Sequence, residues 1–219
     1  MTVSIEAGRR SAAADVPGAV PVDPFAAQEL SEWARALIHS RQNVAPRRLL
    51  PPAPNEAECI SLFEAAAAAP DHGQILPWRF VIVPAARRQA LGEAFAQALL
   101  ERDPQAAPDQ LADARDKATR APFVMLVVVR LGPAEPDVPA FERLIAVGAA
   151  VQNLQLQAHA MGYGCGLTSG RAMRAPALRE LFGLGATEEA VCFINVGTVS
   201  RRKPQRPRPL PSDFVSELP

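Results

Sequence analysis

The sequence predicts a three-layer α+β or α/β domain, in which helices cover both faces of a central sheet. The segment 124–129 is apolar at every position, which is typical of a central strand that is buried on both faces. The segment 141–161 is apolar on nearly every side of a helix, so we expect it to be buried in the core or at a subunit interface. Helical segments alternate with the few strand segments, which favours a sheet between helix layers.

Composition limits the possible functions. The 219 residues are enough to bury one sizeable core, and 23 Lys and Arg balance 23 Asp and Glu, so no global electrostatic case for a nucleic-acid partner exists. Three widely spaced cysteines without a Cys-x-x-Cys pattern argue against a disulfide framework and a structural zinc site. No apolar run reaches membrane-spanning length and no signal-peptide core is present. We therefore expect a cytoplasmic protein without a membrane partner.

Periodicity and turn residues divide the chain into elements. Residues 1–24 mix Ala, Gly, Arg and Pro without periodicity, so we expect a flexible tail, followed by a single domain at 25–219. Asn55, with Glu58 three residues later, predicts a helix N-terminus. Residues 162–170 are expected to form a glycine-rich loop. The other elements are helices at 26–40, 55–68, 86–101, 110–119, 141–161 and 176–182, and strands at 80–83, 124–129 and 190–196.

The glycine-rich segment 164–170 is a weak match to a dinucleotide-binding loop. Such a loop follows a strand and opens a helix, whereas here a helix precedes it. A loop whose backbone lies close to a flat ligand fits better. Ser169 does not stand in a Gly-x-Ser-x-Gly elbow, so a hydrolase nucleophile lacks support.

The turn at 69–80 is the most informative motif. Pro70, Asp71, His72 and Gly73 lie between an Ala-rich helix and an apolar strand, where a histidine and free backbone N–H groups can meet a ligand. The alternative is a solvent-exposed loop histidine. The three histidines show no metal-ligand spacing with one another or with cysteine, so no metal site is predicted.

Two basic clusters interrupt the neutral chain. They are candidates for a phosphate monoester, because the planar guanidinium of arginine gives bidentate hydrogen bonds to phosphate. Two solvated basic loops are the equally plausible alternative. The clusters comprise Arg41, Arg47 and Arg48, and, near the C-terminus, Arg201, Arg202, Lys203, Arg206 and Arg208.

Four places, in order, resemble the nitroreductase family over residues 36–199, and most of all its small branch of proteins described as NAD(P)H nitroreductases. The first is Ser-Arg-Gln-Asn at 40–43, where the family usually has Arg-Arg-Ser. The second is the turn at 69–80, which is similar to the family's Ala-Pro-[Ser/Asp] to Pro-Trp turn. The third is the apolar helix with Gly-Ala-Ala-Val-Gln-Asn-Leu at 148–154, and the fourth is the segment 161–170, where the family often has Trp-Arg-Ser-Gly.

This resemblance implies a nitroreductase-like α/β/α sandwich with a central mixed sheet, which forms a homodimer with two FMN molecules at the subunit interface. The family's reaction needs no acid–base pair, so no catalytic residue is assigned. His72 is expected to reach the flavin across the interface, from a turn that also contributes Pro70 and Asp71. The other expected cofactor contacts are Arg41, Gln42 and Asn43 for the phosphate and ribityl chain, Leu167, Thr168 and Ser169, which line the cofactor from the glycine-rich loop, and Arg206 and Arg208 for the phosphate.

The implied function is a ping-pong reduction of nitro compounds or quinones by NAD(P)H, in which hydride passes through flavin N5. The sequence departs from the family at Gln42 and Asn43, which stand in place of Arg and Ser, and at Leu167 and Thr168, which stand in place of Trp and Arg. Each departure removes a positive charge near the cofactor. A non-catalytic flavin-binding or flavin-storage protein of the same fold is therefore the alternative. A ligand-free interaction module is the third hypothesis.

Overall fold

The computed structural model describes residues 24–132, 137–204 and 206–218, which fall into two compact units. One unit is Leu37–Arg202 and carries the sheet. The other holds the described residues up to Ala36, which form most of helix α1 (Pro24–Ser40), and those from Lys203 onward. Apart from Pro24, the predicted tail lies outside the described residues. The division of the chain into a tail and one domain stays a prediction.

Within the described part of Leu37–Arg202, the sheet has the strand order β1-β5-β3-β2, and β4 also pairs with β5. All ladders between these strands are antiparallel, and the parallel component of the predicted mixed sheet is an isolated bridge between Asn43 and Cys165. The strands are β1 (Leu49–Leu50), β2 (Trp78–Ile82), β3 (Phe123–Arg130), β4 (Gly164–Thr168) and β5 (Glu188–Val199).

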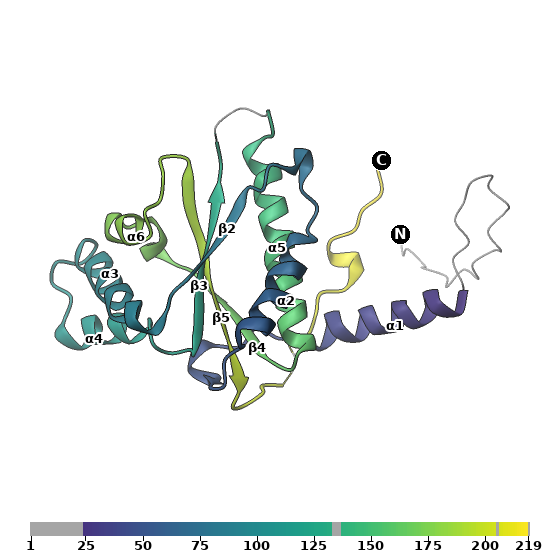
Figure 1. Cartoon of the computed structure of the whole chain (residues 1–219), viewed down its shortest axis with the longest axis horizontal. Helices are drawn as coiled ribbons and strands as arrows, with labels where there is room; N and C mark the ends of the chain where they lie inside the picture. The colour runs from purple at the N-terminus through teal and green to yellow at the C-terminus, as the bar shows by residue number, and fades with distance from the viewer. Residues whose placement is uncertain (1–23, 133–136, 205, 219) are drawn as a thin grey trace. The chain divides into compact units, whose positions relative to one another are not determined.

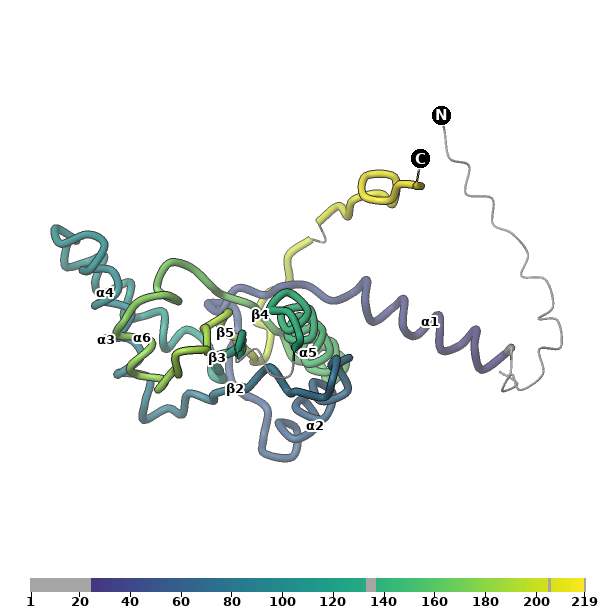
Figure 2. The backbone as a smooth tube through the Cα atoms, turned by 90° about the horizontal axis from the view of Figure 1, so that it is seen from above, coloured from purple at the N-terminus to yellow at the C-terminus, as the bar shows by residue number. Residues whose placement is uncertain are grey.

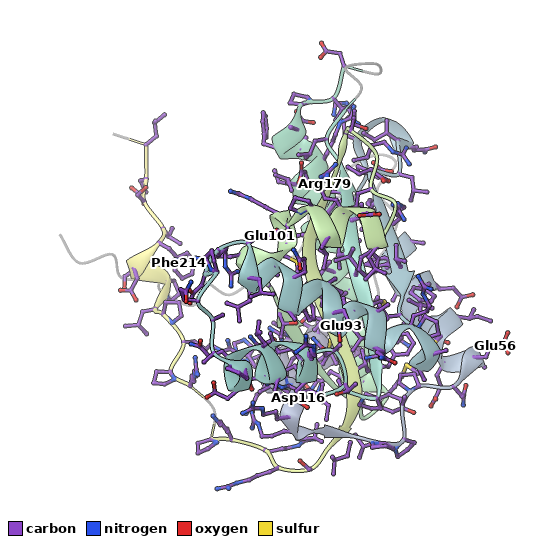
Figure 3. All side chains as sticks on the ribbon, turned by 90° about the vertical axis from the view of Figure 1, so that its left-hand side faces the viewer. Glu56, Glu93, Glu101, Asp116, Arg179 and Phe214 are labelled. Carbon is purple, nitrogen blue, oxygen red and sulfur yellow. The ribbon has the colours of Figure 1, made fainter. Side chains whose placement is uncertain are left out.

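Helices cover both faces of this sheet, so the predicted three layers are confirmed (Figure 1 and Figure 2). Helices α2 (Glu56–Ala67) and α5 (Ala140–Ala160) lie on one face. On the other face are α3 (Arg88–Leu100), α4 (Pro108–Asp116) and α6 (Pro176–Leu181). Figure 3 looks onto this second layer and labels Glu93 on α3, Asp116 at the end of α4 and Arg179 on α6.

The predicted start of α2 is confirmed in atomic detail. The Asn55 side chain accepts a hydrogen bond from the Glu58 N–H at 2.9 Å, and the Glu58 carboxylate accepts one from the Asn55 N–H at 2.8 Å. Both bonds satisfy backbone N–H groups that the end of a helix would otherwise leave open.

Strand β3 is buried on both faces, as its continuous apolar sequence predicts. Its odd-numbered residues from Met125 to Val129 pack against α2 and α5, whereas its even-numbered residues from Val124 to Val128 pack in a second cluster with residues of α3 and α6. Each of these six residues is at most 3% exposed. Side chains of a strand alternate between faces, so this one strand joins both halves of the core.

The prediction of a loop at 162–170 is wrong for residues 164–168, which form β4 and pair with β5. A Cβ on Gly166 would overlap the carbonyl oxygen of Val44, and a Cβ on Gly164 would overlap the side chain of Val199. Glycine therefore allows neighbouring chain segments to approach this strand closely. The same glycines lack the side chains that mark a strand in a sequence, which explains the error.

Helix α5 buries one side and exposes the other. Residues such as Leu154 and Ala158 are fully buried, but Phe141, Leu144 and Ile145 are 45–64% exposed. Gly148 is also exposed, and a Cβ there would meet nothing within 4 Å. Within the described residues, no helix is long and apolar enough to cross a membrane.

A bidentate ion pair ties the two strands on either side of β3. Arg79 on β2 donates to both carboxylate oxygens of Glu188 on β5, at 2.7 and 2.8 Å. This bonding, together with the N–H of Gly185, lowers the pKa of Glu188 to about 2 although partial burial opposes the shift. A group whose pKa is lowered on folding stabilises the fold above its usual pKa of 4.5 and loses that contribution as the pH falls toward 2.

We expect Glu188→Gln to lower the free energy of unfolding by about 1–2 kcal/mol at pH 7, because one partner of a partly buried charged pair is lost. The difference from the wild type should persist at pH 5 and shrink at pH 3, as urea unfolding at the three pH values would measure. Glu189→Gln is the control, since Glu189 is half exposed and lies 3.5 Å from Arg179. An equal loss at pH 7 and pH 3 would contradict this role of Glu188.

Candidate functional site

The segment 41–46 lies beside β4 and is fastened to it. The Asn43 side chain accepts a hydrogen bond from the Leu167 N–H at 2.8 Å, and the Val44 N–H donates to the Cys165 carbonyl at 2.9 Å. Asn43 and Leu167, two of the predicted cofactor contacts, are thus in direct contact. The Asn43 carboxamide oxygen serves to hold β4 in place.

Thr168 ends β4 and is held by a buried amide. Asn195 on β5 is 3% exposed and donates to the Thr168 hydroxyl at 3.0 Å and to the Gly166 carbonyl at 3.1 Å. The Ser169 hydroxyl donates to the Val191 carbonyl at 3.1 Å. These bonds fix the positions of two predicted cofactor contacts.

A cavity of about 590 Å³ opens against Thr168 and Ser169, on the sheet face that α3 and α4 cover. Its volume lies within the usual range for small-molecule sites. Its inner wall is apolar and includes Phe95 and Phe193, whose rings meet edge to face with centroids 5.5 Å apart. Four basic residues also line it, namely Arg102, Lys117, Arg120 and Arg171.

Sequence reasoning missed the basic lining of this cavity. Lys117 and Arg120 lie between α4 and β3, a connection that carries no motif. Asp113 on α4 accepts from Arg120 at 2.5 Å and from Arg47 at 2.8 Å, and it lies 3.9 Å from Lys117. Arg47, which the sequence suggested for phosphate, is therefore paired with a carboxylate at this rim.

Arg41 lies at the other end of the segment 41–46. Its guanidinium donates to the side-chain oxygen of Gln155 on α5 at 3.2 Å, and Gln155 is 4% exposed. Nearby, the Ser40 hydroxyl and His159 Nε2 are 2.7 Å apart. Burial lowers the pKa of His159, and the positive charges of Arg202 and Arg41 lower it further, so positive charge gathers here.

Gln42 lines a small crevice next to this charge, together with Ser40, His159 and Arg202. Arg202 was part of a basic cluster predicted from the sequence. Arg206 and Arg208 belong to the second unit of the chain, so their contact with a phosphate stays a prediction.

The turn after α2 is held in an unusual backbone conformation. Gln74 and Leu76 have positive φ values of 53° and 46°, which side-chain-bearing residues rarely adopt. Asp71 accepts from the Leu76 N–H at 2.8 Å, while its other carboxylate oxygen is buried without a hydrogen-bond partner among the described residues. Strain and unsatisfied polar groups of this kind are concentrated at functional sites.

His72 projects from this turn and its side chain is 69% exposed. Its Nδ1 lies 2.6 Å from the carboxylate of Glu142 in the first turn of α5. Glu142 and Gln155 are thirteen residues apart on one helix, a separation of about 20 Å along its axis. Within one chain, His72 and Arg41 are therefore at opposite ends of α5.

The buried thiols are unsuited to nucleophilic chemistry. Burial raises the pKa of Cys165 to about 12 and that of Cys192 to about 11, so both stay protonated at neutral pH. Among the residues that the structure describes, no group of three His, Cys, Asp or Glu side chains is arranged to hold a metal ion.

The fold is that of an oxidoreductase of the nitroreductase type. The chain belongs to the Nitroreductase family, whose model matches residues 39–198. A Haemophilus influenzae protein named "Putative NAD(P)H nitroreductase" is 32% identical over 173 residues, which cover 78% of this chain and 93% of that protein. YdjA of Escherichia coli K12, which carries the same description, is 32% identical over 166 residues, or 75% of this chain and 87% of YdjA.

Solved structures agree on the fold. The nitroreductase-like family protein from Bacillus cereus matches with a TM-score of 0.71 at 22% identity, over 84% of this chain and 95% of that one. A mutant of the FMN and NADPH-dependent nitroreductase NfnB from a Sphingopyxis strain matches with a TM-score of 0.64 at 19% identity, over 84% and 98%. The family and the fold predicted from the sequence are confirmed.

We expect Asn43→Ala to lower the free energy of unfolding by about 1–2 kcal/mol, because the Leu167 N–H loses its acceptor. Urea unfolding would measure the change. Gln42→Ala, at the neighbouring position, should have little effect. Equal stability of the Asn43 variant and the wild type would show that this side chain does not hold β4.

Proposed function

We propose that this protein is an FMN-dependent oxidoreductase that uses NAD(P)H to reduce nitro compounds or quinones. The observation that carries the proposal is the segment 41–46, which pairs with β4 and joins the positive charge around Arg41 to Pro46 in the wall of the cavity at Thr168 and Ser169. When bound, FMN would supply the hydride transfer between the two substrates.

The residues present fit the two ends of this cofactor. Arg41 and Arg202 offer positive charge to the phosphate, and the Arg41 guanidinium is oriented by the side-chain amide of Gln155. At the other end, the cavity is large enough for a flat ring system and has an aromatic inner wall. Its polar edge consists of the Thr168–Ser169 backbone and the side chains of Lys117 and Arg120.

The structure suggests which basic residues replace the cations that the family usually has near the cofactor and that this chain lacks. Gln42 and Asn43 bring no charge, but Arg202 contributes one close to Arg41. Thr168 likewise brings no charge, but Arg171 lines the same cavity. Arg47 is less suited to this role, because it is 65% exposed and paired with Asp113. These replacements favour the enzyme over the flavin-storage alternative.

Two features support a cofactor site built by two subunits. His72 and Arg41 are at opposite ends of α5 in one chain, so both can meet one flavin most simply if they come from different chains. The apolar exposed side of α5, with Leu144 and Ile145, offers a surface to a second copy. Gly148 lies on the same helix, and glycine is unfavourable inside a helix unless a neighbour must come close.

The purified protein should carry a yellow flavin and oxidise NAD(P)H with a nitroaromatic acceptor. Arg41→Ala should weaken FMN binding by at least about 1.5 kcal/mol, through loss of charge-assisted hydrogen bonds to the phosphate. Titration of FMN fluorescence would measure the affinity, and Arg47→Ala should leave it unchanged.

Unchanged FMN affinity in the Arg41 variant would place the phosphate elsewhere. A colourless protein that FMN does not reconstitute would overturn the proposed function. Bound FMN that NAD(P)H does not reduce under anaerobic conditions would identify the flavin-storage alternative.

Ile145→Glu should convert a dimer into a monomer, because a charge on the exposed apolar side of α5 would be buried at the interface. The variant should also bind FMN at least about tenfold more weakly, since a monomer lacks the His72 turn of a second subunit. Light scattering and FMN titration would measure the two effects. The control is Ala112→Glu, which adds the same charge to an exposed position on α4. A dimer that survives with Glu at position 145 would contradict this interface.

A further inference from the structure

The contact between His72 and Glu142 determines which imidazole nitrogen carries a proton. Only 2.6 Å separates His72 Nδ1 from a carboxylate oxygen of Glu142, so a proton lies between the two atoms. An ionised carboxylate accepts hydrogen bonds and cannot donate them. The proton therefore belongs to Nδ1.

Glu142 stands in the first turn of α5, where the helix dipole favours negative charge. Its side chain is one-third exposed and so keeps some contact with water. The carboxylate is thus a fixed acceptor for the histidine.

A neutral imidazole carries one proton on its two nitrogens. With that proton on Nδ1, Nε2 has a lone pair and acts as an acceptor. No group among the described residues forms a hydrogen bond with Nε2, and the side chain is largely exposed. The strained backbone between Asp71 and Leu76 holds the turn that carries this ring.

We propose that Glu142 is a positioning residue that locks His72 in the Nδ1–H tautomer, so that Nε2 accepts a hydrogen bond from a ligand held by the partner subunit. The ligand group must be a donor. On the proposed function, from which this inference takes its ligand, the donors available are the N3–H of the flavin ring and the ribityl hydroxyl groups. A phosphate or a ring carbonyl offers only acceptors, so neutral His72 does not bind them.

The tautomer can be measured without a cofactor. Full-length protein with ¹⁵N-labelled histidine should give, at pH 8, a long-range ¹⁵N–¹H spectrum in which His72 carries its proton on Nδ1. The chain has only three histidines, so His39→Gln and His159→Gln variants complete the assignment. Glu142→Ala should remove the preference for Nδ1–H, and Glu142→Asp should restore part of it.

Glu56→Ala is the matched control, because it removes a carboxylate from the first turn of α2 and should leave the His72 spectrum unchanged. A His72 proton on Nε2 in the wild type would overturn the proposal. So would a spectrum that Glu142→Ala does not alter. Glu142 lies at the surface, at the end of a helix. Glu142→Gln, with a side chain of the same size as that of Glu142, provides a second variant.

Titration with FMN tests the ligand. In the wild type, FMN should shift the ¹⁵N resonance of His72 Nε2 and leave that of Nδ1 nearly unchanged. His72→Ala and Glu142→Ala should each weaken FMN binding about fivefold, the scale of one neutral hydrogen bond, and the double variant should be no weaker than His72→Ala. Additive losses would overturn the coupling between the two residues.

Different results would overturn the proposed function and the proposed roles of Glu142 and His72. A wild type that binds no FMN would overturn the proposed function and the flavin as the ligand of His72, while the tautomer spectrum would still decide the role of Glu142. A wild type that binds FMN without any change at His72 Nε2 would leave the flavoprotein in place and overturn the contact.

Discussion

The close approach of the segment 41–46 to β4 is the contact on which the candidate site depends. It requires glycine at position 166, where a Cβ would overlap the Val44 carbonyl oxygen. Backbone pairing with Cys165 and the Asn43 side chain then fasten the segment. Because this segment runs from Arg41 to the cavity at Pro46, the same pairing fixes the distance between the charged and the apolar ends of the site.

The predicted site residues of one chain lie on both faces of the sheet, whose central strand β3 is buried on both sides. The cavity is on the face with α3 and α4, whereas His72 is anchored to α5 on the opposite face. In the proposed dimer, complementary halves from two copies would bring these residues together, and the apolar side of α5 offers a surface for the second copy.

Local signals in the sequence were enough for most of the fold. Apolar periodicity and the Asn55 cap located α2, α5 and β3 to within a few residues, because these elements depend on near neighbours in the chain. Strand β4 was not predicted, since it is rich in glycine. Its formation depends on pairing with β5, about thirty residues later in the chain. The candidate site residues also differ in whether a local motif marks them. Motifs indicated Arg41 and His72, but Glu142 is seventy residues from His72 and belongs to no motif.

The distribution of charge over the fold separates paired basic residues from those near Arg41. The chain is neutral overall, yet its basic residues differ in what they contact. Asp113 attracts Arg47 and Arg120, and Glu188 attracts Arg79, so these cations are balanced within the fold. The bond between Arg41 and Gln155 orients a guanidinium. Burial lowers the pKa of His159, and the positive charges of Arg202 and Arg41 lower it further. Positive charge therefore gathers at the end of α5 near Arg41, and on the proposed function this charge favours the phosphate of the cofactor.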